Sequence, residues 1–349
     1  MTESNKETNE QIVEEQSEMY EHHRIVADKG QSPLRIDKFL LYHIANASRN
    51  KIQQAARAGN VLVNGKVVKQ NFKVKPDDVV SVVMTYPPRE VEIIPENIPL
   101  DIVYEDDDIV VVNKPSGMVV HPGFGNFTGT LLNALAYYFE QTGATVDNKH
   151  GYLCHRIDKD TTGLLLIAKN EIAQAIMAKQ FYDHTIDRKY NALVWGDFED
   201  DEGTIEGHIG RDIRNRKRMS VYPDGEYGKE AITHFNVVQR FGYITLVECK
   251  LETGRTHQIR AHFKYIQHPL FNDVTYGGDQ ILKGTTFSKY KQFVNNCFKM
   301  IPRQSLHARS LGFVHPTTKK DMFFESEFPQ DMKSVIDKWE AYVETRNME

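Results

Sequence analysis

The sequence contains little cysteine and no long apolar stretch. Its three cysteines, Cys154, Cys249 and Cys297, lie far apart, whereas a zinc site needs closely spaced pairs, and so small a number fits a reducing compartment. Purely apolar runs reach about five residues, as at 164–168, and a membrane-spanning helix needs about 20. The opening residues, MTESNKETNEQ, are polar throughout and do not form a secretory signal. We therefore expect a cytoplasmic protein.

Motifs of cofactor and metal chemistry are also absent. The glycine-rich stretch GFGNFTGT lacks the Gly-Lys-Ser/Thr ending of a phosphate-binding loop. There is no HExxH motif, and the histidines do not have metal-ligand spacing. A zinc base deaminase is excluded because no H-x-E motif is followed by P-C-x-x-C. We expect neither a cofactor nor a metal.

Charge is unevenly distributed along the chain. The net charge of −5 by itself argues against a nucleic-acid partner. However, residues 34–75 carry nine basic side chains and one acid, Asp37, whereas residues 1–30 carry eight acids and three bases. The acidic residues 1–30 have almost no apolar periodicity, so we expect a disordered tail. The basic segment is a candidate nucleic-acid surface that the total charge hides.

The basic segment is expected to fold as a small module at residues 31–86. Apolar residues recur at helical spacing from Ile36, Ser48 is a good N-cap for a second helix, and Asn64-Gly65 is a strong hairpin signal. The stretch SRNKIQQAARAGNVLVNGKVVKQNFKV resembles the S4 RNA-binding domain. A small folded cap with a solvated basic face is the alternative. The candidate RNA contacts are Arg35, Lys38, Arg49, Lys51, Arg57 and Lys66.

A larger unit follows a proline-rich stretch. The sequence YPPREVEIIPENIPL predicts a stiff, extended linker at residues 87–99. Residues 100–330 mix strands and helices without strict βαβ alternation, which indicates an α+β domain with a mostly antiparallel sheet flanked by helices. Apolar side chains in residues 331–349 share one helical stripe, so we expect an amphipathic helix packed on this domain.

Three segments of the larger unit could carry chemistry. HRIDKDTTGLLLIAK places Asp158 and Asp160 at the start of a buried strand, and DRKYNALVWG places Tyr190 beside two basic residues. The third segment, LETGRTHQIRAHFKYIQHPLFNDVTYGG, places arginines on an amphipathic helix. Each has an ordinary explanation on its own. An Asp before a strand often caps a turn, a Tyr at a strand start is often half-buried, and a helical Arg often faces solvent.

Together the three segments resemble the RluA-type family of RNA pseudouridine synthases. An S4 module in front of them is typical of many members, and the architecture is most similar to the ribosomal large-subunit synthase D subfamily. Two departures, Ile157 for Leu and Thr162 for Ser, are conservative. Asn272 stands where the family commonly has Gly, and Asn tolerates a left-handed backbone. The matching motifs stand at residues 155–163, 189–192, 254–260, 268–269 and 276–278.

The resemblance implies a reaction and assigns its residues. Conversion of uridine to pseudouridine involves no redox change, so no cofactor is needed. One carboxylate suffices as nucleophile or base. That carboxylate is Asp158, which Arg260 keeps charged and oriented. Tyr190 offers a face to the flipped uracil, and Arg156 fills the gap in the RNA or holds a phosphate. Whether Asp158 attacks the sugar, attacks the ring or removes a proton stays open.

Two further features are candidate RNA contacts. Thr256 is predicted to begin the helix that carries Arg260, and a helix start suits a phosphate. The stretch RDIRNRKRMS contains a single acid, Asp212, and its alternative is a solvated hairpin tip. Its basic residues are Arg211, Arg214, Arg216, Lys217 and Arg218.

The sequence therefore predicts a monomeric RNA pseudouridine synthase acting on large-subunit (23S) ribosomal RNA or its precursor particle. Transfer RNA is the alternative substrate. A non-catalytic RNA-binding assembly factor is a different class, and the intact set of Asp158, Tyr190 and Arg260 argues against it. A hydrolase is the third possibility. Glycosidases use two carboxylates, and Asp160 is the near partner for Asp158.

Overall fold

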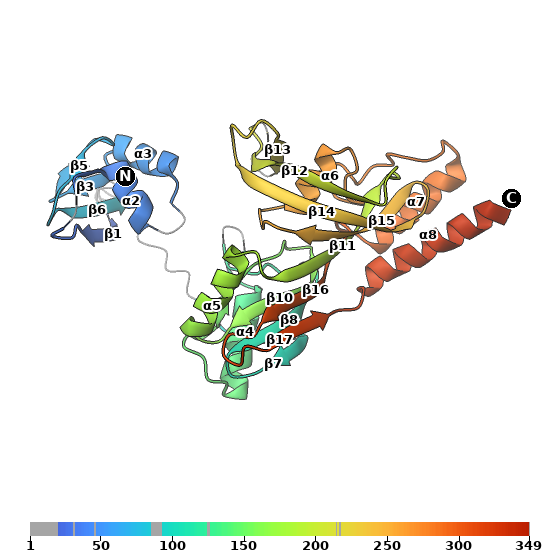
Figure 1. The fold of residues 1–349 in the computed structure, drawn as a ribbon, viewed down its shortest axis with the longest axis horizontal. Helices are drawn as coiled ribbons and strands as arrows, with labels where there is room; N and C mark the ends of the chain where they lie inside the picture. The colour runs from blue at the N-terminus through green and yellow to red at the C-terminus, as the bar shows by residue number, and fades with distance from the viewer. Residues whose placement is uncertain are drawn as a thin grey trace, which may run out of the picture. The chain divides into compact units, whose positions relative to one another are not determined.

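The computed structural model divides into two compact units, the first ending at residue 90 and the second beginning at residue 91 (Figure 1). Among the described helices, none combines the length and the apolar run that a membrane crossing requires. The structure describes residues 20–30, 32–44, 47–84, 93–123, 126–213, 215 and 218–348.

The first unit contains the predicted pair of helices and the predicted hairpin. The Ser48 side chain accepts a hydrogen bond from the Lys51 amide and caps the second helix. Asn64 and Gly65 form the hairpin turn with φ of 50° and 76°, the left-handed region that these residue types tolerate. Its helices are α2 (Ile36–His43) and α3 (Arg49–Arg57). Its strands are β1 (Tyr20–Val26), β3 (Val61–Val63), β4 (Lys66–Val67) and β6 (Val79–Met84) in one sheet, and β2 (Leu34–Arg35) paired with β5 (Lys73–Val74).

Strand β1 corrects the prediction of a disordered tail through residue 30. It pairs antiparallel with β6, with Ile25 opposite Val80. Ala27, just after the strand, is only 1% exposed and belongs to the core of the unit. The strand was missed because only a few apolar residues stand among its histidines and charges. Residues 1–19 of the predicted tail lie outside the described residues.

The prediction of a stiff, extended linker at residues 87–99 is also wrong for residues 93–99, which do not link two units. Ile93 and Ile98 pack against the core of the second unit. The Asn133 side chain donates to the Ile94 carbonyl oxygen at 2.8 Å, and the Glu96 carboxylate accepts from the Gly129 amide. These residues are therefore part of the second unit. Residues 85–92 lie outside the described residues.

The second unit is built on an 11-stranded sheet that is mostly antiparallel, so the prediction of an α+β domain is confirmed. Strands β10 and β16 form the one parallel pair among the described strands, and the other pairs are antiparallel. The order is β13-β12-β14-β15-β11-β16-β10-β8-β7, with β17 beside β16 and β9 beside β10. The bounds are β7 (Ile102–Glu105), β8 (Ile109–Lys114), β9 (Tyr152–Leu153), β10 (Thr162–Ala168), β11 (Asp187–Trp195), β12 (Glu202–Arg211), β13 (Met219–Tyr222), β14 (Lys229–Arg240), β15 (Ile244–Leu251), β16 (Leu306–Val314) and β17 (Asp321–Glu325).

Helices flank this sheet. The side chains of Thr130 and Asn170 cap the N-termini of α4 and α5 by accepting backbone amides. The C-terminal helix buries one apolar stripe, in which Met332, Val335 and Trp339 are fully buried. The helices are α4 (Leu131–Thr142), α5 (Glu171–Tyr182), α6 (Gln258–Tyr265), α7 (Ser288–Met300) and α8 (Gln330–Met348).

Candidate active site

The loop of residues 155–161 joins β9 to β10, and two buried cations hold its main chain. Lys114 donates from Nζ to the carbonyl oxygen of Lys159 at 2.9 Å. Arg303 donates from Nη1 to the carbonyl oxygen of the next residue, Asp160, at 3.0 Å. Both cations bind backbone atoms, so the loop is fixed whatever side chains it presents.

Each of these cations has a further anchor. Lys114 also donates to the carbonyl oxygens of Pro115 and Met118, and its burial lowers the pKa of the amine to about 7. Arg303 forms two parallel hydrogen bonds to the carboxylate of Asp331, in the first turn of α8, at 2.7 and 2.9 Å. The C-terminal helix thus contributes indirectly to the position of the loop.

Gly163 closes the loop at the start of β10. Its φ is 110°, and a Cβ added there would lie 2.2 Å from the carbonyl oxygen of Ala308 on β16. No side chain fits at that distance, so glycine alone allows the two parallel strands to approach. The close approach places the end of the loop beside the start of β16, where Thr162 lies opposite His307.

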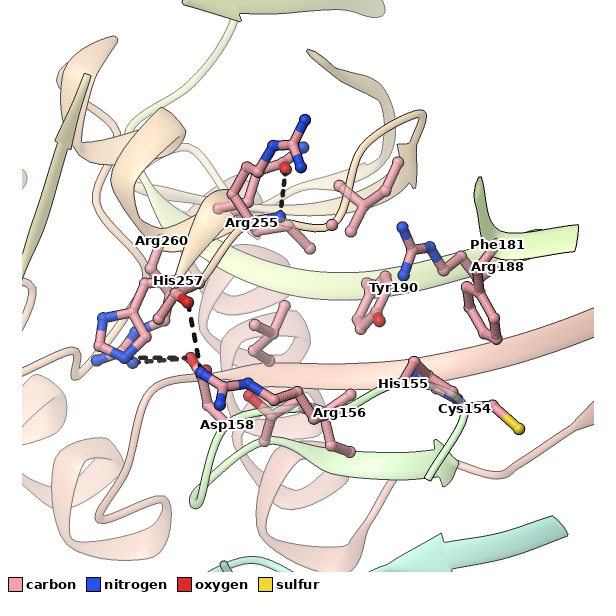
Figure 2. Close-up of a pocket in the computed structure, with 18 of the residues that line it drawn as sticks. Cys154, His155, Arg156, Asp158, Phe181, Arg188, Tyr190, Arg255, His257 and Arg260 are labelled. Carbon is pink, nitrogen blue, oxygen red and sulfur yellow. Dashed lines mark hydrogen bonds and ion pairs between the residues drawn. The ribbon is translucent and has the colours of Figure 1, made fainter. Parts of the chain in front are cut away.

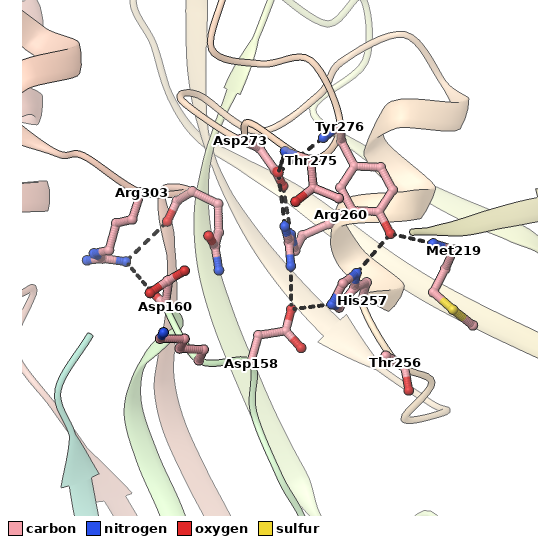
Figure 3. A network of polar contacts seen from close by, with 12 residues as sticks. Asp158, Asp160, Met219, Thr256, His257, Arg260, Asp273, Thr275, Tyr276 and Arg303 are labelled. Atoms are coloured by element: carbon pink, nitrogen blue, oxygen red, sulfur yellow. Dashed lines mark hydrogen bonds and ion pairs between the residues drawn. The ribbon is translucent and has the colours of Figure 1, made fainter. Parts of the chain in front are cut away.

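Arg260 donates a hydrogen bond to Asp158, and a second carboxylate, that of Asp273, orients the Arg260 side chain (Figure 3). Arg260, on α6, donates from Nε and Nη2 to both oxygens of Asp273 at 2.7 and 3.0 Å. Its remaining nitrogen, Nη1, donates to Oδ2 of Asp158 at 2.9 Å. Burial opposes the charge on Arg260, but the two carboxylates raise its pKa above the ordinary arginine value. Arg260 therefore presents a fixed positive charge to Asp158.

His257 also lies against Asp158. Its Nε2 is 3.8 Å from Oδ2 of Asp158, and its Nδ1 is 3.0 Å from the hydroxyl of Tyr276. The residue has φ of 54° and is the N-cap of α6, which begins at Gln258. The prediction that Thr256 begins this helix is therefore wrong. The left-handed residue at 257 turns the chain before the helix can start.

A cavity of about 680 Å³ opens beside Asp158. Figure 2 shows Asp158 and Arg260 at one end and Arg188 and Phe181 at the other, with Tyr190 between them. Tyr190 is 6% exposed, and its burial raises the pKa of its hydroxyl. The structure therefore brings Asp158, Tyr190 and Arg260 together as the sequence predicts.

Arg156 lies at the rim of this cavity and is exposed. Its Nη2 is 3.4 Å from the hydroxyl of Thr256. A second cavity, of about 350 Å³, is also lined by Arg156, Asp158, His257 and Arg260. An elongated molecule in the cleft would therefore pass both the Asp158 carboxylate and the exposed guanidinium of Arg156.

Comparison with known proteins decides the family. Residues 108–265 match the family model described as RNA pseudouridylate synthase, and residues 34–80 match the S4 domain. An RNA pseudouridine synthase of Chlorobaculum parvum is 44% identical over 313 residues, which cover 89% of this chain and 95% of that protein. The chain belongs to the RNA pseudouridine synthase family. It is an isomerase with an S4 domain, as the sequence predicts.

Other relatives of this synthase carry more specific names. The ribosomal large subunit pseudouridine synthase D of Zymomonas mobilis is 39% identical over 311 residues, which cover 86% of this chain and 92% of that protein. The structure of human RNA pseudouridylate synthase domain containing 4 has a TM-score of 0.53 at 21% identity and covers 69% of this chain and 93% of its own. That likeness shows a shared fold.

Two of the predicted RNA contacts in the S4 unit of the synthase form ion pairs within that unit. Arg35 and Arg49 both form ion pairs with Asp37, which is fully buried, at 2.9 and 3.1 Å. Burial raises the cost of that charge, but the hydrogen bonds from these arginines and Gln53 lower the pKa of Asp37 well below its usual range. The other four predicted contacts, Lys38, Lys51, Arg57 and Lys66, are exposed.

The basic hairpin between β12 and β13 of the synthase is partly described. Arg218 donates from Nε to Asp212 at 2.8 Å, and the Ser220 hydroxyl donates to the same oxygen. Arg218 thus stabilises the hairpin, although its side chain stays 39% exposed. Arg211 is exposed. The other predicted contacts, Arg214, Arg216 and Lys217, lie outside the described residues.

One group of described residues in the synthase combines side chains of the types that bind metal ions: Asp106, Asp108 and His315. Asp106 Oδ2 accepts from the Tyr104 hydroxyl at 2.7 Å and from His315 Nε2 at 2.8 Å. His315 Nδ1 accepts from the amide of Thr318. The ligand atoms are therefore engaged in hydrogen bonds that tie β7 to the end of β16.

Three residues of the site were not predicted as site residues. Asp273, His257 and Tyr276 all lie within the segment that the sequence identifies, and two of them stand in its family motifs. The signal that the sequence offered is that all three are polar residues in the same segment as Arg260. Their contacts with it could not be derived, because they depend on how the chain folds back after α6.

Proposed function

We propose that this synthase isomerises uridines in large-subunit (23S) ribosomal RNA, with Asp158 as the single catalytic carboxylate. The observation that carries the proposal is the Arg260 guanidinium, which Asp273 orients and which donates to Asp158 at 2.9 Å beside a cavity lined by Tyr190. The fixed guanidinium holds a partly buried carboxylate in one orientation, as a nucleophile or base requires. A protein that only binds RNA has no use for such a charge.

The proposed reaction breaks the bond from ribose C1′ to uracil N1 and forms a bond from C1′ to C5. The hydrogen on C5 is lost and N1 gains one, so no electrons are exchanged with another molecule. Because the C1′–N1 bond is buried in stacked RNA, the uridine must be extruded. Tyr190 provides a ring for the uracil, and base–aromatic stacking is worth about 1–3 kcal/mol. Arg156 at the rim occupies the gap or holds a phosphate.

The ribosomal substrate is supported by the S4 domain and by the relatives named large-subunit synthase D. We place the reaction in the cytoplasm, where the three free cysteines remain reduced. We propose that the protein works as a monomer without a cofactor. Transfer RNA is the second candidate substrate.

The test compares two acids of the same loop. Asp158→Asn keeps the size of the side chain but removes its charge, so we expect no detectable pseudouridine while RNA affinity and the melting temperature stay near wild type. Asp160→Asn is the matched control and should stay active within a few-fold. Both are assayed on fragments of large-subunit ribosomal RNA and on transfer RNA. An active Asp158→Asn enzyme would contradict the catalytic assignment, conversion of transfer RNA alone would contradict the substrate, and release of free uracil would indicate a hydrolase.

A further inference from the structure

We infer that His257 is a positioning residue that faces Asp158 as a neutral imidazole with its hydrogen on Nε2. Together with Arg260 it holds one oxygen of the carboxylate, Oδ2, so that the other oxygen, Oδ1, is the one that reacts. The inference rests on the proposed function, because it takes Asp158 to be the catalytic carboxylate.

The tautomer follows from the hydrogen bonds of Tyr276. Its hydroxyl oxygen accepts from the backbone amide of Met219 at 2.9 Å. Within the described part of the chain, Nδ1 of His257 at 3.0 Å is the one acceptor near enough for the hydroxyl hydrogen. Nδ1 therefore accepts, and the single hydrogen of a neutral imidazole must sit on Nε2. That atom is the one 3.8 Å from Asp158 (Figure 3).

The neutral state follows from the surroundings of the ring. Burial is the largest effect and lowers the pKa of His257, and the nearby guanidinium groups of Arg260 and Arg156 lower it further. The carboxylates of Asp158 and Asp273 act in the opposite direction but do not reverse the shift. An uncharged donor leaves the negative charge of Asp158 available for chemistry, which a second fixed cation would reduce.

Both contacts of the Asp158 side chain use the same oxygen. Arg260 Nη1 and His257 Nε2 approach Oδ2, and no described side chain or amide donates to Oδ1. A carboxylate that meets both neighbours through one oxygen leaves the other oxygen free, with the lone pairs that a nucleophile or base uses. At 3.8 Å the histidine contact is longer than a hydrogen bond, and such contacts tighten when substrate fills a site.

The backbone supports this arrangement. His257 has φ of 54°, a left-handed conformation that few non-glycine residues adopt. Such a strained conformation persists where the surrounding structure requires it. Here the conformation points the ring between Tyr276 and Asp158, immediately before the helix that carries Arg260.

The test combines a spectroscopic and a kinetic readout on the full chain. Nitrogen NMR of histidine-labelled protein, with the His257 signal assigned from His257→Gln, should show the Nε2–H form at pH 7.5. In Tyr276→Phe that signal should move toward a mixture of tautomers, because Nδ1 has lost its donor. These spectra need no RNA, so they are independent of the catalytic assignment.

The kinetic arm uses two variants of different polarity. In His257→Gln the amide oxygen can accept from Tyr276 and the amide nitrogen can donate to Asp158, so the single-turnover rate should stay within about threefold of wild type. In His257→Leu the rate should fall at least about tenfold at unchanged RNA affinity. Equal rates in the two variants, or a histidine signal of the Nδ1–H or charged form at pH 7.5, would overturn the inference. If Asp158→Asn is active although the Nε2–H signal is present, the proposed function fails and the interaction of His257 with Asp158 stands.

Discussion

At the scale of single residues, the site depends on the planar shape of arginine. Arg260 makes three hydrogen bonds in one plane, two to Asp273 and one to Asp158. An ammonium group is a point charge on a flexible stem and cannot hold both carboxylates in fixed positions. The geometry of Asp158 is therefore set by a residue more than a hundred positions away in the sequence.

Arg260→Lys tests this dependence. The positive charge is kept and the fork is lost, so we expect the single-turnover rate to fall by about tenfold or more while RNA affinity changes little. Arg255→Lys, in the same segment, is the control and should lose far less. The measurements are single-turnover pseudouridine formation and RNA binding at one salt concentration. A lysine variant as fast as wild type would remove Arg260 from the mechanism.

His155, at the start of the same loop, makes the fold sensitive to acid. Its Nε2 accepts from the Leu166 amide, which requires a neutral ring, and burial together with Arg188 lowers its pKa to about 3. Between that pH and the ordinary value of about 6.5, the unfolded chain binds a proton that the folded chain does not. Stability must therefore be lost as the pH falls below about 6.5, by as much as about 2 kcal/mol at pH 5.

His155→Gln should reduce that loss. Glutamine can still accept from the Leu166 amide but does not titrate. The fall in melting temperature between pH 7.5 and pH 5.0 should be smaller in the variant than in wild type, even if the variant is somewhat less stable at pH 7.5. An unchanged or larger fall would mean that protonation of His155 is not linked to unfolding.

At the scale of helices and strands, the sequence predicted what short-range chemistry determines. The cap at Ser48 and the turn at Asn64-Gly65 were predicted from single residues and are present. Asn272, expected to tolerate a left-handed backbone, has φ of 59°.

The features that the sequence did not predict depend on contacts between distant segments. Strand β1 gains its structure by pairing with β6, which its own residues do not reveal. The start of α6 was placed too early, because His257 adopts its left-handed turn through contacts with Tyr276 and Asp158. Asp158, Tyr190 and Arg260 could be predicted because each stands in a short sequence motif. The hydrogen bonds from Arg260 to Asp273 could not, because they depend on how the chain folds back after α6.

The C-terminal helix α8 offers a test of packing. Trp339 is fully buried among aromatic rings, including those of Phe293 and Tyr290. Trp339→Ala should lower the free energy of unfolding by about 3–5 kcal/mol, because it removes a large buried side chain and leaves a cavity. Lys338→Ala, next in the helix and exposed, should change it by less than about 0.5 kcal/mol. Denaturant unfolding measures both, and a similar small decrease in the two variants would mean that α8 does not contribute to the core.

At the scale of the whole molecule, the chain consists of an S4 unit and a catalytic unit that contains the predicted linker residues 93–99. The S4 unit concentrates basic residues in a protein whose net charge is negative. We expect the two units to divide the work, with affinity from the first and chemistry from the second.

A fragment of residues 91–349 tests this division. It should fold and convert a minimal RNA substrate at high concentration, because it keeps the hydrogen bonds that tie residues 94 and 96 to the second unit. Its RNA affinity should be weaker, and the slope of log affinity against log salt should flatten by about 0.7 for each phosphate of single-stranded RNA that the fragment no longer neutralises. A fragment beginning at residue 101 should be less stable by melting. An unchanged salt slope would contradict the role given to the S4 unit.

The hydrogen bond from Arg303 to the loop that carries Asp158 has a consequence for the order in which the site forms during synthesis of the chain. Synthesis proceeds from the N-terminus, so Asp158 leaves the ribosome long before Arg303, and Arg303 before its partner Asp331. A nascent chain that has emerged only as far as β15 contains the aspartate but lacks one of the two cations that fix its loop. The loop can therefore take its final position only after α8 has begun to emerge, so the site is completed late in the synthesis of the chain.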